Sequence, residues 1–143
     1  MASRSALTLV IADDHKMLRD AVKAILLEGG HQVIGEASDG DEAVRLCHEL
    51  EPDVLLLDLS MPSLNGIDAS RKIAKDCPGI RIIILSMHAE EHYIRESLQV
   101  GALGYVTKSN SASFLLEAIE AVRRGEICVR ANAGLPLVGQ TQA

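Results

Sequence analysis

Short apolar runs alternate with amphipathic stretches along most of this 143-residue chain. Runs such as residues 9–12 and 54–57 contain no polar residue, which indicates strands that are buried on both faces. The stretches between them carry apolar residues at helical spacing, as Leu18, Val22 and Ile25 do. This alternation predicts repeated βα units, and therefore a parallel sheet with helices on both faces.

The pattern predicts one domain of five strands and five helices. The expected strands span residues 7–12, 32–37, 54–57, 81–85 and 104–106. The expected helices span residues 16–27, 41–50, 66–76, 90–100 and 111–124, with Ser111 as the cap of the last one. The pattern is lost after Gly125, so we assign residues 6–126 to the domain and residues 127–143 to a linker, a tail or a cloning remnant.

The composition narrows the class of protein and its setting. Hydrophobic residues make up 48% of the chain, enough for a substantial core, and the formal net charge of −6 argues against nucleic-acid binding by these residues. The three cysteines show no paired spacing, which is typical of a reducing, cytoplasmic setting. We expect no membrane association, because there is no signal core and no apolar run approaches the roughly 20 residues of a membrane helix.

Charged residues stand where the buried strands should end. The first expected strand is followed by Asp13 and Asp14, the third by Asp58 and the fifth by Lys108. We expect these side chains to converge, because the carboxyl ends of parallel strands meet at one edge of a sheet. Three neighbouring carboxylates raise one another's pKa unless a cation intervenes, and a hard divalent ion such as Mg²⁺ fits that role. The sequence therefore predicts an acidic metal site that can receive a phosphoryl group.

Four segments carry a resemblance to a known family: residues 12–15 (Ala-Asp-Asp-His), 57–66 (Leu-Asp-Leu-Ser-Met-Pro, then Asn-Gly), 86–89 (Ser-Met-His-Ala) and 101–108 (Gly-Ala-Leu-Gly-Tyr-Val-Thr-Lys). Together they resemble the receiver domain of two-component response regulators, over about residues 6–126. The Asp-Asp-His start, and Ser109 in place of a proline after the lysine, are similar to the NarL/FixJ branch. The resemblance implies a flavodoxin-like (βα)5 fold whose five-stranded parallel sheet has the order 2-1-3-4-5, with helices on both faces.

The resemblance also implies a role for each matching residue. Asp58 is expected to be the phosphoacceptor, whose carboxylate attacks phosphorus in line and forms an acyl phosphate. Asp14 is expected to ligate Mg²⁺, or Mn²⁺ as the alternative, with Asp13 acting partly through water. Asp58 and the backbone carbonyl of Ser60 complete the expected protein ligands. Lys108 is expected to pair with Asp58 and then with the phosphate.

The same resemblance implies a switch. Ser86 is expected to hydrogen-bond the phosphoryl oxygen and to move toward it, which makes room for Tyr105 to turn inward. Tyr105 fits a partly buried filler about as well as a switch residue. Ser60 and His88 are expected to tune the lifetime of the phosphate, and we interpret His15 and His88 as loop or helix-start residues rather than metal ligands.

A signalling switch that is not a turnover enzyme is therefore the leading hypothesis, with a sensor histidine kinase as the partner. The NarL/FixJ branch typically joins its receiver to a helix-turn-helix domain, for which there is no room after Arg124. DNA binding is thus expected only through a missing C-terminal part, and homodimerisation on phosphorylation is implied by resemblance alone. A stand-alone receiver, or an interaction module that acts without phosphorylation, stays open.

Two other classes of protein use similar pieces and rank lower. A metal-dependent phosphatase with an aspartyl-phosphate intermediate usually has Asp-x-Asp after the first strand, whereas here the candidate nucleophile follows the third and Ser60 stands two residues after Asp58. A flavodoxin-like nucleotide binder needs a phosphate loop rich in Ser, Thr or Gly after the first strand. Asp13 and Asp14 at that point would repel a phosphate. Near the site, Gly66 is expected to permit a tight backbone.

Overall fold

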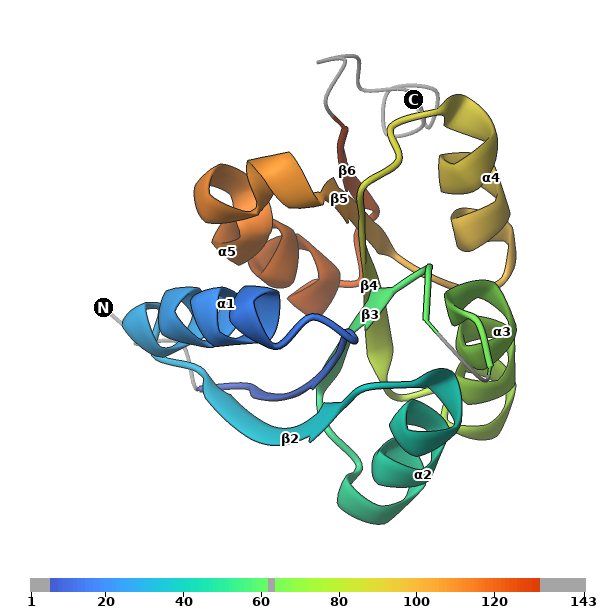
Figure 1. Cartoon of the computed structure of the whole chain (residues 1–143), viewed down its shortest axis with the longest axis horizontal. Helices are drawn as coiled ribbons and strands as arrows, with labels where there is room; N and C mark the ends of the chain where they lie inside the picture. Colours follow the sequence, from blue (N-terminus) through green and yellow to red (C-terminus); the bar gives the residue numbers. More distant parts are fainter. Residues whose placement is uncertain (1–5, 62–63, 132–143) are drawn as a thin grey trace.

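Six parallel strands form a single sheet in the computed structural model, which describes residues 6–61 and 64–131 (Figure 1). Their order is β2-β1-β3-β4-β5-β6. The strands are β1 (Thr8–Ala12), β2 (Gln32–Ala37), β3 (Val54–Asp58), β4 (Arg81–Ser86), β5 (Gly104–Thr107) and β6 (Cys128–Arg130). Pro62 and the expected tail from residue 132 onward lie outside the described residues.

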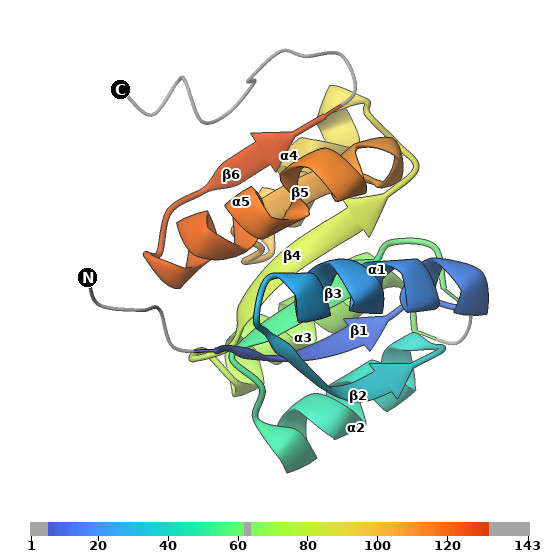
Figure 2. The ribbon, with the colours of Figure 1, turned by 90° about the vertical axis from the view of Figure 1, so that its left-hand side faces the viewer.

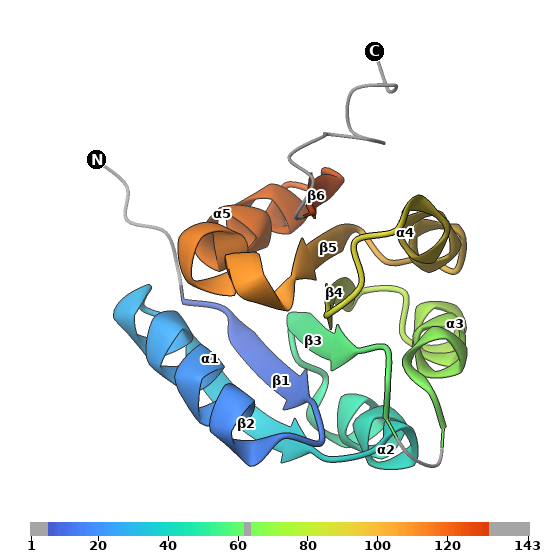
Figure 3. The same ribbon diagram turned by 45° about the horizontal axis from the view of Figure 1, so that its top comes forward.

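Helices cover both faces of the sheet (Figures 1 and 3). One face is covered by α1 (Lys16–Glu28) and α5 (Ser111–Arg123), and the other by α2 (Gly40–Leu50), α3 (Gly66–Asp76) and α4 (Glu91–Gln99). A single 3₁₀ turn, η1 (Lys108–Asn110), joins β5 to α5. None of the helices in the described part of the chain has the length and hydrophobicity needed to span a bilayer.

The central strands are apolar because each of their faces meets a layer of helices. All five residues of β3 are buried, and the side chains of its four apolar residues alternate between two cores. Leu55 and Leu57 belong to the core beneath α2, α3 and α4, whereas Val54 and Leu56 belong to the core beneath α1 and α5. The prediction of strands buried on both faces is confirmed, and the ten expected elements end within one residue of their predicted limits.

The prediction of five strands was wrong by one. Residues 128–130, which we assigned to a linker or tail, form β6 and pair in parallel with β5 (Figure 2). In this pairing Tyr105 lies opposite Val129. Cys128 and Val129 are buried, and the sheet therefore extends beyond the limit that we set at residue 126. Ser111 is not the cap of α5, because its hydroxyl donates to the carbonyl of Lys108 at 2.9 Å in the preceding turn.

Candidate functional site

The candidate site lies at the carboxyl edge of the four adjacent strands β1, β3, β4 and β5. Asp13 and Asp14 follow β1, whereas Asp58 is the last residue of β3. Ser86 is the last residue of β4, and Lys108 follows β5. Parallel pairing with matched registers brings these ends together, so residues far apart in the sequence share one edge, as predicted.

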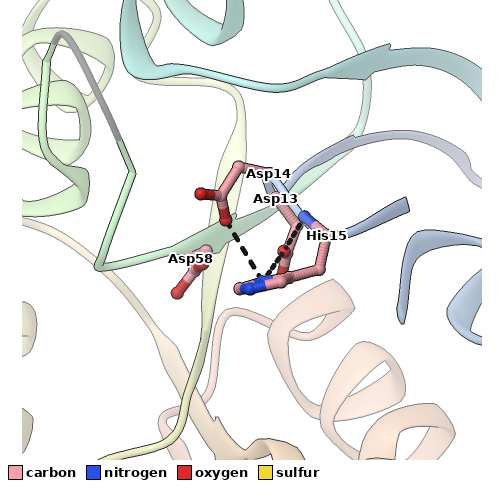
Figure 4. A group of neighbouring side chains, drawn as sticks. All are labelled: Asp13, Asp14, His15 and Asp58. Atoms are coloured by element: carbon pink, nitrogen blue, oxygen red, sulfur yellow. Dashed lines mark hydrogen bonds and ion pairs between the residues drawn. The ribbon is translucent and has the colours of Figure 1, made fainter. Parts of the chain in front are cut away.

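The carboxylates form a close cluster. Asp13, Asp14 and Asp58 each offer an oxygen, and together with a ring nitrogen of His15 these atoms all lie within 4.8 Å of one another (Figure 4). Asp13 and Asp58 are buried, with 2% and 3% of their surface exposed, whereas Asp14 is exposed. Such proximity of like charges in a buried site is unfavourable without a cation to offset it.

Lys108 supplies one positive charge to this cluster. Its Nζ lies 3.0 Å from Asp13 Oδ2 and 3.2 Å from Asp58 Oδ2, and only 9% of its side chain is exposed. Burial nevertheless raises the pKa of Asp58; Lys108 opposes this rise, and the charge of Asp13 adds to it. One ammonium group therefore does not offset the loss of hydration at the Asp58 carboxylate.

The cluster fits a hard divalent cation. Asp13 Oδ2 is buried without a hydrogen-bond partner, although it makes the ion pair with Lys108. Carboxylate oxygens are the protein ligands that Mg²⁺ prefers, and Mg²⁺ keeps several waters, which suits a site with one exposed acid. The three carboxylates, including the Asp13 oxygen without a hydrogen-bond partner, thus provide oxygen donors of the kind that such an ion needs.

His15 joins the cluster more closely than we expected. As expected for a residue at a helix start, His15 is the N-cap residue of α1. Its Nδ1 also lies 3.2 Å from Asp13 Oδ1 and 3.2 Å from Asp14 Oδ1. Its backbone N–H donates to Asp13 Oδ1 at 2.8 Å. The only sequence signal for this contact is that His15 directly follows the two acids.

A tight backbone supports Asp58 from the following loop. The N–H of Ser60 donates to Asp58 Oδ1 at 3.2 Å, and the N–H of Gly66 donates to the carbonyl of Leu59 at 3.0 Å. A Cβ on Gly66 would lie 2.3 Å from the carbonyl oxygen of Asp58, well inside van der Waals contact. This agrees with the expectation that Gly66 permits a close approach beside the site.

Ser86, His88 and Tyr105 form a second set of contacts at the same edge. The Ser86 hydroxyl accepts from the N–H of His88 at 3.0 Å, and the Tyr105 hydroxyl donates to the carbonyl of His88 at 2.7 Å. Tyr105 is fully buried, and burial raises its pKa to about 12. The inward position that we expected only after phosphorylation is therefore the position that Tyr105 holds here. The His88 ring stacks on Tyr93 of α4 at 4.2 Å.

Comparison with known families agrees with this arrangement. A family model described as the response regulator receiver domain matches residues 9–120, which is most of the chain. The chain belongs to this family. The match spans the elements that place Asp13, Asp14, Asp58 and Lys108, so this receiver domain has its acidic cluster within the matched region.

The relatives of this receiver domain are transcriptional regulators and response regulators. It is 37% identical to the transcriptional regulatory protein DegU of Brevibacillus brevis, over 86% of this chain and 52% of that protein. It is 36% identical to the response regulator UvrY of Escherichia coli, over 84% of this chain and 56% of that protein. The chain thus spans about half the length of the curated relatives that it matches.

Solved structures lead to the same branch. A LuxR-family response regulator from Aurantimonas sp. SI85-9A1 superposes with a TM-score of 0.88 at 31% identity, over 97% of this chain and all of that one. The receiver domain of a NarL regulator from Mycobacterium tuberculosis gives a TM-score of 0.80 at 31% identity, over 86% of this chain and 100% of that one. The predicted resemblance to the NarL/FixJ branch is therefore confirmed.

Proposed function

We propose that this receiver domain is a phosphorylation-dependent switch, and that Asp58 accepts a phosphoryl group from a sensor histidine kinase. The observation that carries the proposal is the position of Asp58, buried at the end of β3 with Lys108 Nζ at 3.2 Å and two further carboxylates beside it. A buried acid beside like charges is costly, and its perturbed pKa together with a paired cation favours a chemical role.

The transfer at Asp58 is an in-line displacement. A carboxylate oxygen of Asp58 forms a bond to phosphorus while the bond from phosphorus to the kinase imidazole nitrogen breaks, and that nitrogen keeps the electron pair. Lys108 lies where it contributes positive charge to the phosphoryl oxygens. Catalysis of this kind needs positioning and charge rather than a further covalent step.

A divalent cation would offset the negative charge that Lys108 leaves uncompensated at the site. Asp14, Asp58 and the backbone carbonyl of Ser60 would hold Mg²⁺, or Mn²⁺ in its place, with Asp13 acting partly through water. When bound, the ion offsets the charge of the carboxylates and of the incoming phosphoryl oxygens. Asp13 also keeps its contact with Lys108, so one acid connects the two cations.

The switch itself runs from the acyl phosphate to α4. Phosphorylation adds about one negative charge and three acceptor oxygens at Asp58. In this structure the Ser86 hydroxyl accepts a hydrogen bond from the N–H of His88 at 3.0 Å. On phosphorylation the hydroxyl turns toward the phosphoryl oxygens, and this hydrogen bond is lost. The His88 carbonyl also accepts a hydrogen bond from the Tyr105 hydroxyl, and the His88 ring stacks on Tyr93. A shift of His88 therefore changes the surface of α4 and β5. The inward Tyr105 is the form that phosphorylation stabilises.

Other parts of the proposal concern the lifetime of the phosphate and the partners. Ser60 and His88 tune hydrolysis of the acyl phosphate, and the domain acts in signalling rather than as an enzyme with an external substrate. Output passes to a C-terminal helix-turn-helix domain that binds DNA, by analogy with the transcriptional regulators that the chain matches over about half of their length. Phosphorylation promotes a homodimer, and the cytoplasm is the setting, which is supported by the free thiols of all three cysteines.

The direct test uses a small phosphodonor in place of the kinase. The protein is incubated with acetyl phosphate and Mg²⁺, and intact mass is measured for the wild type, for Asp58→Asn and for Asp68→Asn as a control carboxylate exposed on α3. We expect the mass of one phosphoryl group in the wild type and in Asp68→Asn, dependent on Mg²⁺, and none in Asp58→Asn. An equal gain in Asp58→Asn would overturn the assignment of the acceptor.

A further inference from the structure

The loop between β1 and α1 has to hold two carboxylates beside a third. Asp13 and Asp14 both belong to this loop, and their oxygens lie within 4.8 Å of an Asp58 oxygen. Mutual repulsion would drive the loop away from Asp58 in the absence of a compensating contact. Lys108 offsets part of this repulsion through its ion pairs with Asp13 and Asp58, and contacts to the backbone of Asp13 hold the loop itself.

Arg19 in the first turns of α1 provides such a contact. Its Nη1 donates to the backbone carbonyl of Asp13 at 2.6 Å, and its backbone N–H donates to the carbonyl of His15 at 3.0 Å. On the other side, the N–H of Asp13 donates to the carbonyl of Ala37 at the end of β2 at 2.9 Å. The peptide groups of Asp13 are thus fixed from both sides, by β2 and by Arg19.

The guanidinium of Arg19 is itself held in place. Its Nε donates to Glu36 Oε1 of β2 at 3.0 Å, and Lys23 Nζ donates to the other oxygen, Glu36 Oε2, at 2.8 Å. Only 15% of the Arg19 side chain is exposed, and it connects α1, β2 and the acidic loop. Glu36 is shared with Lys23, and the contact of Arg19 with the site is a hydrogen bond to a backbone carbonyl, so its contribution to the site is mainly one of position.

We propose that Arg19 is a positioning residue of the acidic site, which holds Asp13 and Asp14 in the arrangement that binds the divalent ion, through its hydrogen bond to the Asp13 carbonyl. Groups one step behind metal ligands commonly set ligand orientation, and their removal typically weakens metal binding by about 10–100-fold. This inference rests on the proposed function for the identity of the ion. It adds a residue that contacts none of the reacting atoms.

The test compares Arg19→Gln with Lys23→Gln. Both variants remove one cationic contact to Glu36, but only Arg19→Gln removes the hydrogen bond to Asp13. Mg²⁺ affinity is measured by titration followed in NMR spectra. We expect the Kd for Mg²⁺ to rise about tenfold in Arg19→Gln and less than about twofold in Lys23→Gln. Equal Kd values in wild type and Arg19→Gln, with both proteins folded, would overturn the proposal.

A second measurement separates this proposal from the proposed function. Backbone ¹⁵N relaxation is recorded without metal, and we expect lower order parameters at Asp13 and Asp14 in Arg19→Gln than in wild type or Lys23→Gln. If the wild type bound no Mg²⁺ and took no phosphoryl group, the proposed function would fail, while the relaxation data would still decide the role of Arg19. Unchanged order parameters at Asp13 and Asp14 would refute that role.

Discussion

Asp58 is a carboxylate whose charged form is disfavoured by its surroundings. It is buried, it lies beside Asp13, and its folded-state pKa is raised chiefly because burial penalises the charged form. Lys108 lowers the cost without removing it. An added positive charge, or conversion of the free carboxylate to another group, would lower the cost of burying this charge. The proposed reaction includes both events.

Asp58→Asn is expected to stabilise the metal-free protein at neutral pH. In the unfolded chain the ordinary Asp pKa is about 3.9. The raised folded-state pKa means that stability from protonated Asp58 is present below that value and is lost as pH rises through the folded-state pKa. The free energy of unfolding of the variant minus that of wild type should therefore grow between acidic and neutral pH in urea titrations. A difference that shrinks over that range would contradict the account.

Gly66→Ala is expected to distort the loop that follows Asp58. The new Cβ would lie 2.3 Å from the carbonyl oxygen of Asp58 and 2.6 Å from Leu59 Cα, so the backbone has to shift. Such overpacking costs about 1–3 kcal/mol, and acetyl phosphate should label Asp58 more slowly. Gly79→Ala is the matched control, because a Cβ there has no neighbour within 4 Å. Equal stability of the two variants would show that the loop accommodates the methyl group.

At the level of single residues, the sequence predicted the site wherever a strand end determines the position. Asp13, Asp14, Asp58 and Lys108 follow from that rule, because parallel strands deliver their ends to one edge. The hydrogen bond from Arg19 to the Asp13 carbonyl could not be predicted, since it depends on how α1 packs beside β2. The inward position of Tyr105 was expected only after phosphorylation, because no sequence pattern distinguishes its two positions.

At the level of secondary structure, the strong periodic signals were predictive and the short one was not. The central strands are buried on both faces, which forces continuous apolar runs that the sequence displays. By contrast, β6 spans three residues and includes Arg130, so it has no distinctive pattern. It forms because the free edge of β5 offers hydrogen-bonding groups to the segment that follows α5.

Removal of β6 is expected to weaken the fold. A chain that ends at Glu126 is compared with one that ends at Ala131, so that the pair differs by the segment that contains β6. Loss of the buried Val129 alone should lower the free energy of unfolding by on the order of 2 kcal/mol, since full burial of a Val side chain contributes about 1.5–3 kcal/mol. Equal urea midpoints for the two chains would mean that β6 adds nothing to the stability of the sheet.

For the whole molecule, the contacts around His88 connect the acidic edge to one side of the fold. The backbone N–H and carbonyl of His88 form hydrogen bonds with the hydroxyls of Ser86 and Tyr105, and the His88 ring stacks on Tyr93 of α4. Tyr105 also pairs across the sheet with Val129 of β6. Ser86, at the end of β4, is thus connected through His88 to α4 and to Tyr105, which lies beside β6.

Tyr105→Phe is expected to separate phosphorylation from its transmission. The variant keeps the ring but leaves the His88 carbonyl without its donor, which should cost about 1 kcal/mol. Labelling of Asp58 by acetyl phosphate should stay within about twofold of wild type, because Tyr105 makes no contact in the proposed reaction. The NMR chemical-shift changes that a beryllofluoride mimic causes in α4 should be smaller in the variant than in wild type. Changes as large as those of wild type would exclude the Tyr105 hydroxyl from the transmission of the signal to α4.

The most direct test of the central claim is to locate the phosphoryl group by chemistry. The wild-type protein is incubated with acetyl phosphate and Mg²⁺, reduced with borohydride, digested and sequenced by mass spectrometry. Borohydride converts an aspartyl phosphate to homoserine, so the account predicts homoserine at position 58 and unmodified aspartate at positions 13 and 14. Homoserine at position 13 or 14, or at none of the three, would contradict the claim that Asp58 is the acceptor.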